Sequence, residues 1–358
     1  MLPVMGYPRS HLVDPDTPGY FHCVSRCVRR AFLCGVDEDT GQDFEHRRQW
    51  IEDRIHHLAK QYAIGVLAYA VMSNHVHLVL ATDPGMTAQW DDEEVVRRWR
   101  QVFPVRHLAK AAAIADGDLS TEPAPTVSPE IIAIWRKRLG SLSWFMRTLL
   151  EPIARRANDE DDCTGRFWEG RFHAQALLDE RNLIAASVYV DLNPVRAGMV
   201  RSLEASRHTS VALRIAQQKA ETAPSTVANA PAPDPHLAPV AGRTRLFDSL
   251  PMRLSQYLEL VAWSGKVSIH ALESAETSPT PKTETTPVET LRTLFDCDPS
   301  EWLEGFTAFR DRWRLAGSGL AVRKWLDQHQ RHWMRRSKRR RRGAETASRT
   351  AETTASAF

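Results

Sequence analysis

The chain has 358 residues, of which 42% are hydrophobic and 25% are charged, and its net charge is +3. This is the composition of an ordinary globular protein, long enough for one sizeable core and a second, smaller one. No apolar run is long enough to span a membrane, and residues 1–10 lack the charged-then-apolar order of a signal peptide, so a cytoplasmic location is expected. Five scattered cysteines without a C-x-x-C pair argue against a disulfide framework and against a structural zinc site.

The distribution of charge is more informative than the net value. Residues 335–342 read RRSKRRRR, whereas the first 200 residues hold slightly more Asp and Glu than Lys and Arg. A basic tail of this kind binds nucleic acid nonspecifically or serves as a solubilising end. Any DNA contact in the first 200 residues is therefore expected to come from local arginine clusters.

The first elements alternate between strand and helix. Residues 18–30 begin with a Pro-Gly turn and continue with aromatic and β-branched residues, which predicts a strand. Residues 43–62 have apolar residues at helical spacing. The apolar run 64–72 predicts a buried strand, and after a short Ser-Asn turn residues 75–81 predict the next one. Residues 83–130 are expected to form a helix followed by a mobile insertion.

The second group of elements returns to the sheet and ends on a helix. Residues 131–157 predict a strong amphipathic helix, broken near Gly140. Residues 165–178 predict a turn followed by an edge strand. Residues 179–192 predict a helix with Asp179 at or near its N-cap, because a short acidic side chain can accept from the first free amides.

Composition suggests four regions along the chain. Residues 1–205 precede a segment, residues 206–245, that becomes rich in Ala and Pro and is predicted to be a disordered linker. Residues 246–334 carry periodic apolar residues that suit a small helical domain of unknown role. Residues 335–358 are predicted to be a basic disordered tail.

The histidine pair is the first candidate site. Side chains alternate along a strand, so His75 and His77 point to one face while Val76 points to the other, and both imidazoles can converge on one cation. Two imidazoles leave positions on a divalent ion for phosphate oxygens. The alternative is that both are half-exposed strand residues without a ligand, and the short H-x-H motif alone favours that alternative.

The second candidate is Tyr189, which lies late in the predicted helix 179–192. Asn193 follows four residues later on the same helix face, and Pro194 ends the helix at about that point. Both side chains can then face the histidines. The equally weighted alternative is that Tyr189 packs inward and that Asn193 caps the helix.

Two motifs together resemble a known family. The run AYAVMSNHVHLVL at 68–80 and the run SVYVDLNPVRAGMV at 187–200 are similar to the HUH-class single-tyrosine transposases, in particular the REP-associated tyrosine transposase branch. The segments PGYFHCVSR and GRFWEGRF resemble the first strand and the Trp-containing segment of that family. The resemblance covers about residues 1–205, which it implies are the catalytic domain. This chain is roughly twice as long as the compact members, and the insertion within 83–130 and everything after 205 lie outside the resemblance.

The resemblance implies a fold, a reaction and a substrate. The fold would be α+β, a ferredoxin-like or RRM-like antiparallel sheet with helices on one face, here with a small C-terminal helical region added. Tyr189 would be the nucleophile, and His75, His77 and Asn193 would bind Mg²⁺ or Mn²⁺. The substrate would be single-stranded DNA with hairpin-forming repeats, cut and rejoined through a 5′-phosphotyrosine by a monomer or a homodimer.

Arginines and one tryptophan are the candidate DNA contacts, because Arg binds phosphate bidentately and Trp stacks on unpaired bases. These residues are Arg26, Arg29, Arg30, Arg166, Trp168 and Arg171. Trp168 is equally well interpreted as a core anchor. Competing functions are a replication initiator or relaxase of the same class, a non-catalytic or domesticated repeat-binding protein, and a structural metal-binding domain.

Overall fold

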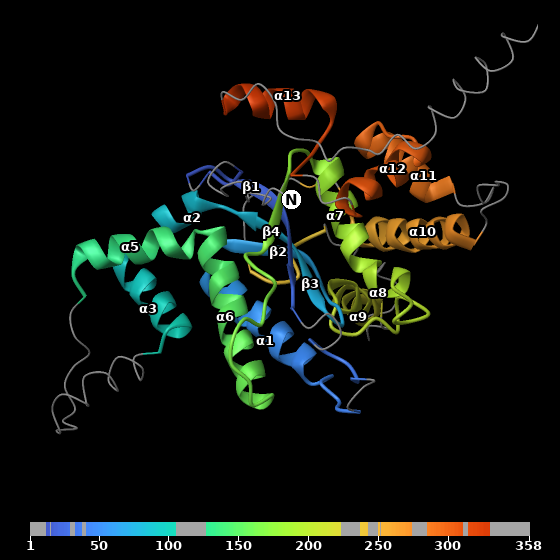
Figure 1. Cartoon of the computed structure of the whole chain (residues 1–358). Coiled ribbons are helices and arrows are strands. Elements are labelled where there is room, and N and C mark those ends of the chain that lie inside the picture. Colours follow the sequence, from blue (N-terminus) through green and yellow to red (C-terminus); the bar gives the residue numbers. More distant parts are fainter. Residues whose placement is uncertain are drawn as a thin grey trace, which may run out of the picture.

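One mixed sheet lies at the centre of the molecule, with helices on both sides of it (Figure 1). The structure is a computed structural model, and it describes residues 12–14, 16–28, 33–37, 41–104, 127–222, 237–242, 250, 252–273, 285–310 and 314–329. Its five strands are β1 (Gly19–Arg26), β2 (Ile64–Val71), β3 (His75–Thr82), β4 (His173–Leu177) and β5 (Leu315–Ala316).

The order of strands across the sheet is β2-β3-β1-β4-β5. The first four strands are antiparallel to their neighbours, and β1 lies between β3 and β4. This is the arrangement that a βαββαβ ferredoxin-like chain produces, so the predicted α+β fold class is confirmed. The fifth strand was not predicted: β5 pairs parallel to β4 at Ala176 and Leu177, so β4 is not an edge strand there.

The first face of the sheet packs against α1 (Arg47–Gln61) and α6 (Leu142–Glu160). Alternate strand residues such as Cys23 and Leu78 join apolar residues of these helices in one cluster. The helical stretch 131–157 is broken near Gly140 as predicted, since α5 (Pro129–Leu139) ends there and the Ser141 side chain accepts from the first turn of α6. Thus α1 and α6 are the two helices that a ferredoxin-like fold packs on one face of its sheet.

The second face is covered as well. The helices on this side are α7 (Glu180–Asp191), α9 (Ser210–Thr222), α10 (Leu254–Glu273), α11 (Thr285–Phe295) and α12 (Pro299–Arg310). Their apolar residues form one cluster with Val79, Ala81 and Leu177 of the sheet. The helices expected to form a small separate domain thus share a core with α7. A sheet that is apolar on both faces needs both faces covered, which explains this second layer.

The segment 206–245, predicted as a disordered linker, contains structure where it is described. It holds α9, in which Val211 and Arg214 are fully buried, because SVALRIAQQKA is amphipathic and free of Gly and Pro. Further on, the Val240 amide donates to the Val66 carbonyl of β2 at 2.9 Å. Gly242 then takes a φ of +76°, and a side chain there would come within 2.3 Å of a β2 carbonyl oxygen.

The remaining helices are short or lie at the periphery: α2 (Pro84–Ala88), α3 (Asp92–Val102), α8 (Asn193–Arg196) and α13 (Gly319–Gln328). None of the helices in the described ranges is both long and apolar enough to cross a bilayer. Residues 105–126, Arg29, Arg30 and the basic tail lie outside the described residues.

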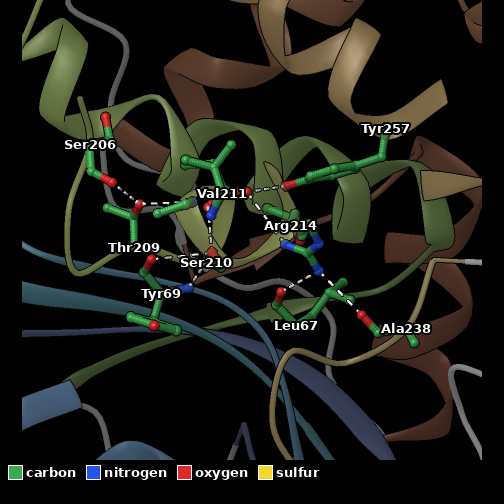
Figure 2. A network of polar contacts seen from close by, with 12 residues as sticks. Leu67, Tyr69, Ser206, Thr209, Ser210, Val211, Arg214, Ala238 and Tyr257 are labelled. Carbon is green, nitrogen blue, oxygen red and sulfur yellow. Dashed lines mark hydrogen bonds and ion pairs between the residues drawn. The ribbon is translucent and has the colours of Figure 1, made fainter. Parts of the chain in front are cut away.

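A buried polar network ties the end of α7 to the rest of the second layer (Figure 2). The Asp191 carboxylate accepts hydrogen bonds from the Ser210 hydroxyl, from the Val211 amide at 3.0 Å and from the Tyr257 hydroxyl at 2.6 Å. It also pairs with the Arg214 guanidinium at 3.4 Å. Arg214 in turn donates to the carbonyl of Leu67 on β2 at 2.6 Å.

The network compensates the cost of burying charge. Asp191 and Tyr257 have no exposed surface. Burial raises the pKa of Asp191, and Arg214 with the donors from Ser210, Tyr257 and Val211 opposes that shift. Burial also raises the pKa of Tyr257 well above its usual value, so its hydroxyl keeps the proton that it donates.

We expect Asp191→Ala to lower the free energy of unfolding by about 3–5 kcal/mol, because it leaves the Arg214 charge buried and unpaired. Replacing both partners, Asp191→Leu with Arg214→Met, should recover part of that loss. Glu151→Ala, at an exposed ion pair on α6, is the control and should cost less than about 1 kcal/mol. Urea unfolding followed by circular dichroism measures all three, and equal losses for Asp191→Ala and Glu151→Ala would contradict the role of the network.

Candidate active site

A stripe of polar side chains crosses the otherwise apolar face of the sheet beneath α7. His22 on β1, His77 on β3 and Gln175 on β4 lie on neighbouring strands and are 2%, 6% and 1% exposed. All three point to the α7 side, because Val79 and Leu177, two residues further along β3 and β4, belong to the cluster on that side. Buried polar groups are retained when they are hydrogen-bonded to one another.

The two predicted metal-binding histidines lie together at the start of β3. The ring centroids of His75 and His77 are 4.7 Å apart, with the rings at 70° to each other. His75 is half-buried, and its Nδ1 is hydrogen-bonded to the Asn74 side-chain oxygen. An amide oxygen can only accept, so His75 carries its proton on Nδ1 and keeps Nε2 as the ring's lone-pair nitrogen.

Tyr189 reaches this pair from the helix above. Its ring centroid is 6.1 Å from that of His77 and 6.1 Å from that of His22, and it meets both rings edge-on. The helix is fixed at its start as predicted, since the Asp179 side chain accepts from the Asn182 amide at 2.8 Å. Residues more than a hundred positions apart in sequence are thus adjacent in space.

Two phenylalanines of α12 cover the tyrosine. The rings of Phe306 and Phe309 lie 6.3 Å and 5.6 Å from the Tyr189 ring, whose residue is 8% exposed. On another side, the Arg196 guanidinium carbon lies 5.5 Å from the centre of the Tyr189 ring. Burial lowers the pKa of Arg196, and the Tyr189 hydroxyl opposes that shift.

Asn193 begins α8, directly after the tyrosine helix. Its side-chain amide donates to the Tyr189 carbonyl oxygen at 3.2 Å, one turn back. This contact is typical of a residue that closes a helix end. The role of Asn193 as a metal ligand stays a prediction.

As neutral imidazoles 4.7 Å apart by ring centroid, His75 and His77 are the kind of donor pair that binds a divalent ion. Within the described ranges, no group of three or more His, Cys, Asp or Glu side chains could hold a metal ion. A further ligand from these ranges would then be of another type, such as an amide, carbonyl or hydroxyl oxygen, and a bound phosphate would supply others.

Arg26 lies beside His75, on the neighbouring strand β1. It is the last residue of β1 and pairs directly with His75 in the register between β1 and β3. Its Nε atom is buried and makes no hydrogen bond among the described residues. On the side of β1 away from β3 lies the loop that follows α6, whose Glu169 amide donates to the Arg26 carbonyl at 2.8 Å. Neighbouring strands are about 5 Å apart, so the backbone of Glu169 lies about 10 Å from that of His75.

That loop and α6 enclose a groove of about 700 Å³. Arg166 and Arg171 line it and are exposed, and half-buried Trp144 lines it from α6. Trp168 is only 8% exposed, and its indole nitrogen donates to the Leu150 carbonyl at 2.9 Å. These contacts favour the interpretation of Trp168 as a core anchor. Trp144 is the more accessible indole of the groove.

Sequence reasoning missed His22, Gln175 and Trp144. A weak signal existed for the first two, because a polar residue at an inward position of a buried strand needs a partner. Their pairing depends on the register of three strands that are far apart in the sequence. Trp144 lies within the first turn of an amphipathic helix and carried no separate signal.

Comparisons with known proteins give limited information. No protein-family model and no curated protein matches the chain. A solved structure that is similar is that of a REP-associated tyrosine transposase bound to a REP hairpin, with 11% sequence identity and a TM-score of 0.33. The match covers 62% of this chain and 90% of that one. Likeness at this level carries no functional argument, so the function must be inferred from the residues of the site.

We expect Phe309→Ala to make the Tyr189 phenol more accessible, because Phe309 is the nearer of the two rings that cover it. The measurement is the rate of tyrosine nitration, followed at each tyrosine by peptide mass spectrometry. Phe145→Ala is the matched control, since Phe145 packs on Tyr62 beneath the opposite face at 5.4 Å. Nitration should rise several-fold at Tyr189 in the first variant only. Unchanged protection of Tyr189 in Phe309→Ala would show that α12 is not its cover.

Proposed function

We propose that this protein is a metal-dependent, tyrosine-nucleophile transferase that cuts and rejoins single-stranded DNA. The observation that carries the proposal is the convergence of His75, His77 and Tyr189 in one site between the sheet and α7. A structural core has no need of two adjacent imidazoles beside a tyrosine. The sequence resemblance to REP-associated tyrosine transposases names the same three residues.

The chemistry is a phosphodiester exchange. The Tyr189 oxygen forms a bond to the phosphorus as the bond from phosphorus to the 3′-oxygen breaks. The phenol proton ends on that oxygen, which gives a 5′-phosphotyrosine and a free 3′-hydroxyl. A second 3′-hydroxyl can reverse the exchange and join different ends, because the phosphotyrosine retains the bond energy. Bound Mg²⁺ or Mn²⁺ would stabilise the charge that develops on the phosphate.

The protein's own residues have three tasks in this scheme. His75 and His77 would hold the ion through their Nε2 atoms. Arg196, beside the Tyr189 ring, would stabilise negative charge that develops at the site. Arg26, next to His75 and with its Nε unpartnered within the described part of the chain, would bind a phosphate of the strand that enters the site.

The groove between α6 and the 163–172 loop suits an unpaired part of the same strand. Arg166 and Arg171 would bind its phosphates, and Trp144, which lines the same groove, would contact a base. The groove lies on the α6 side of the sheet and the site on the α7 side, so a strand bound at both would pass around the sheet past Arg26. The partner we propose is therefore single-stranded DNA, with hairpin-forming repeats as the class that the sequence resemblance implies.

One observation favours a second function. Tyr189 is covered by Phe306 and Phe309, which would suit a protein that binds repeats and does not cut them. Both functions need the groove and Arg26. Only the enzyme needs Tyr189 to reach a phosphate, so a covalent adduct separates the two.

We expect Tyr189→Phe to abolish covalent DNA attachment, because the ring is kept and only the nucleophilic oxygen is lost. The assay incubates a labelled pool of hairpin-containing single strands with the protein and Mn²⁺, then separates denatured adducts by electrophoresis. Tyr62→Phe, on the opposite face of the sheet, is the control and should leave adduct formation unchanged. An adduct that persists in Tyr189→Phe would rule out Tyr189 as the nucleophile. A wild-type protein that binds the pool without forming an adduct would favour the repeat-binding function.

We expect Arg166→Gln with Arg171→Gln to weaken binding of single-stranded DNA and to reduce its salt dependence. If each arginine neutralises one phosphate, the slope of log affinity against log salt should fall by about 1.4, since single strands lose about 0.7 per phosphate contact. The control is Arg97→Gln with Arg100→Gln on α3, which removes the same net charge away from the groove. Equal effects of the two double variants would mean that the groove makes no specific contact.

A further inference from the structure

We infer that His22 and Gln175 form a hydrogen-bonded relay that positions His77 for metal binding by fixing which of its ring nitrogens carries the proton. This inference rests on the proposed function, because it concerns the metal site of that reaction. His22 and Gln175 touch neither substrate nor metal in this scheme and act through His77, so they are positioning residues.

The relay starts at Gln175. Its side-chain oxygen lies 3.4 Å from Nδ1 of His22, and both residues are almost completely buried. An amide oxygen can only accept, so Nδ1 of His22 must be the nitrogen that carries the proton. In a neutral imidazole the other nitrogen is then the acceptor. Gln175 therefore makes Nε2 of His22 a lone-pair nitrogen.

The hydrogen bond between His22 and His77 then fixes the tautomer of His77. Nε2 of His22 lies 2.9 Å from Nδ1 of His77. The ring planes differ by 8° and the ring centroids are 5.1 Å apart, which is about one hydrogen bond plus two ring radii. The two rings thus lie end to end in nearly one plane, as a linear N–H···N hydrogen bond requires. His77 donates from Nδ1, and its lone pair is on Nε2.

His75 is held in the same tautomer by a different partner. Its Nδ1 is hydrogen-bonded to the Asn74 oxygen, so its lone pair is also on Nε2. Each histidine of the pair is thus held at Nδ1 by a neighbour, and each presents Nε2 as a donor nitrogen. Metal-binding histidines are oriented in this way by the partner of their second ring nitrogen.

Packing holds the relay in place. Tyr189 and Phe309 meet the His22 ring edge-on, at centroid distances of 6.1 Å and 5.9 Å. His22 also lies on β1 between β3 and β4, so strand pairing fixes its distance from both partners. A ring confined on these sides keeps the orientation that the two hydrogen bonds need.

The experiment reads the tautomer and the metal affinity separately. The full chain is labelled with ¹⁵N-histidine, and the tautomer of His77 is read by NMR without metal, with its signal identified by its loss in His77→Gln. Mn²⁺ affinity is then measured by calorimetry. The variants are His22→Phe, which keeps a ring but offers no acceptor, and His22→Gln, which can place an acceptor oxygen near the position of Nε2.

In the wild-type chain we expect His77 to be protonated at Nδ1 alone. His22→Phe should mix the two tautomers of His77 and weaken Mn²⁺ binding by about 10- to 100-fold, the range for loss of an outer-shell partner. His22→Gln should restore most of both. A purely structural role of His22 would not produce this difference between the two variants. His56→Phe, a half-buried histidine that contacts Tyr69, is the matched control and should change neither quantity.

Two results would overturn the relay. One is a wild-type His77 protonated at Nε2, which would mean that the hydrogen bonds run in the opposite direction. The other is an unchanged His77 tautomer in His22→Phe. A wild-type protein that shows the expected tautomers but binds no Mn²⁺ would support the relay and contradict the proposed metal-dependent function, so the two failures are distinguishable.

Discussion

The structure depends on one buried carboxylate, that of Asp191. It lies two residues after Tyr189 and two before Asn193, and it bonds to α9, to Tyr257 on α10 and, through Arg214, to β2. Removing such a charge from water is costly unless each lone pair is satisfied, so the surrounding helices can take few other positions. The same contacts that offset the burial of Asp191 also fix the end of the helix that carries the candidate nucleophile.

The candidate site occupies the boundary between this anchored helix and the sheet. Strand alternation places His22, His77 and Gln175 on the face beneath α7, where neighbouring positions are apolar. In an apolar surrounding, hydrogen bonds between polar groups are stronger and an unpaired group is costly. The stripe can therefore hold fixed proton positions, which is what metal binding by imidazole requires.

Local patterns predicted much of the fold. The apolar run 64–72, the H-x-H strand and the Asp179 cap follow from period and spacing, and the order of elements fits one antiparallel sheet. What the sequence could not predict depends on long-range pairing: β5 beside β4, α9 within a segment judged by its Ala and Pro content, and the partners of Asp191. In the site, His75, His77 and Tyr189 carried motifs, whereas His22 and Gln175 are identified only once three strands are in register.

Phe306 and Phe309 stabilise the fold by packing on Tyr189, and the same packing hinders access of a substrate to its hydroxyl. Burying one Phe side chain contributes about 1.5–3 kcal/mol, so separating Phe306 and Phe309 from the tyrosine costs roughly 3–6 kcal/mol. The state in which the two rings have moved away from Tyr189 then has a population of about one in a hundred to one in ten thousand. The apparent affinity for DNA that binds only this open state is lowered by the same factor. Under the proposed function, a strand held in the groove by Arg166 and Arg171 and at the site by Arg26 would have to supply that energy from its phosphate contacts. If the proposed function holds, cleavage should depend more steeply on salt than binding to the groove alone, because the cleaved strand must also engage Arg26 at the site.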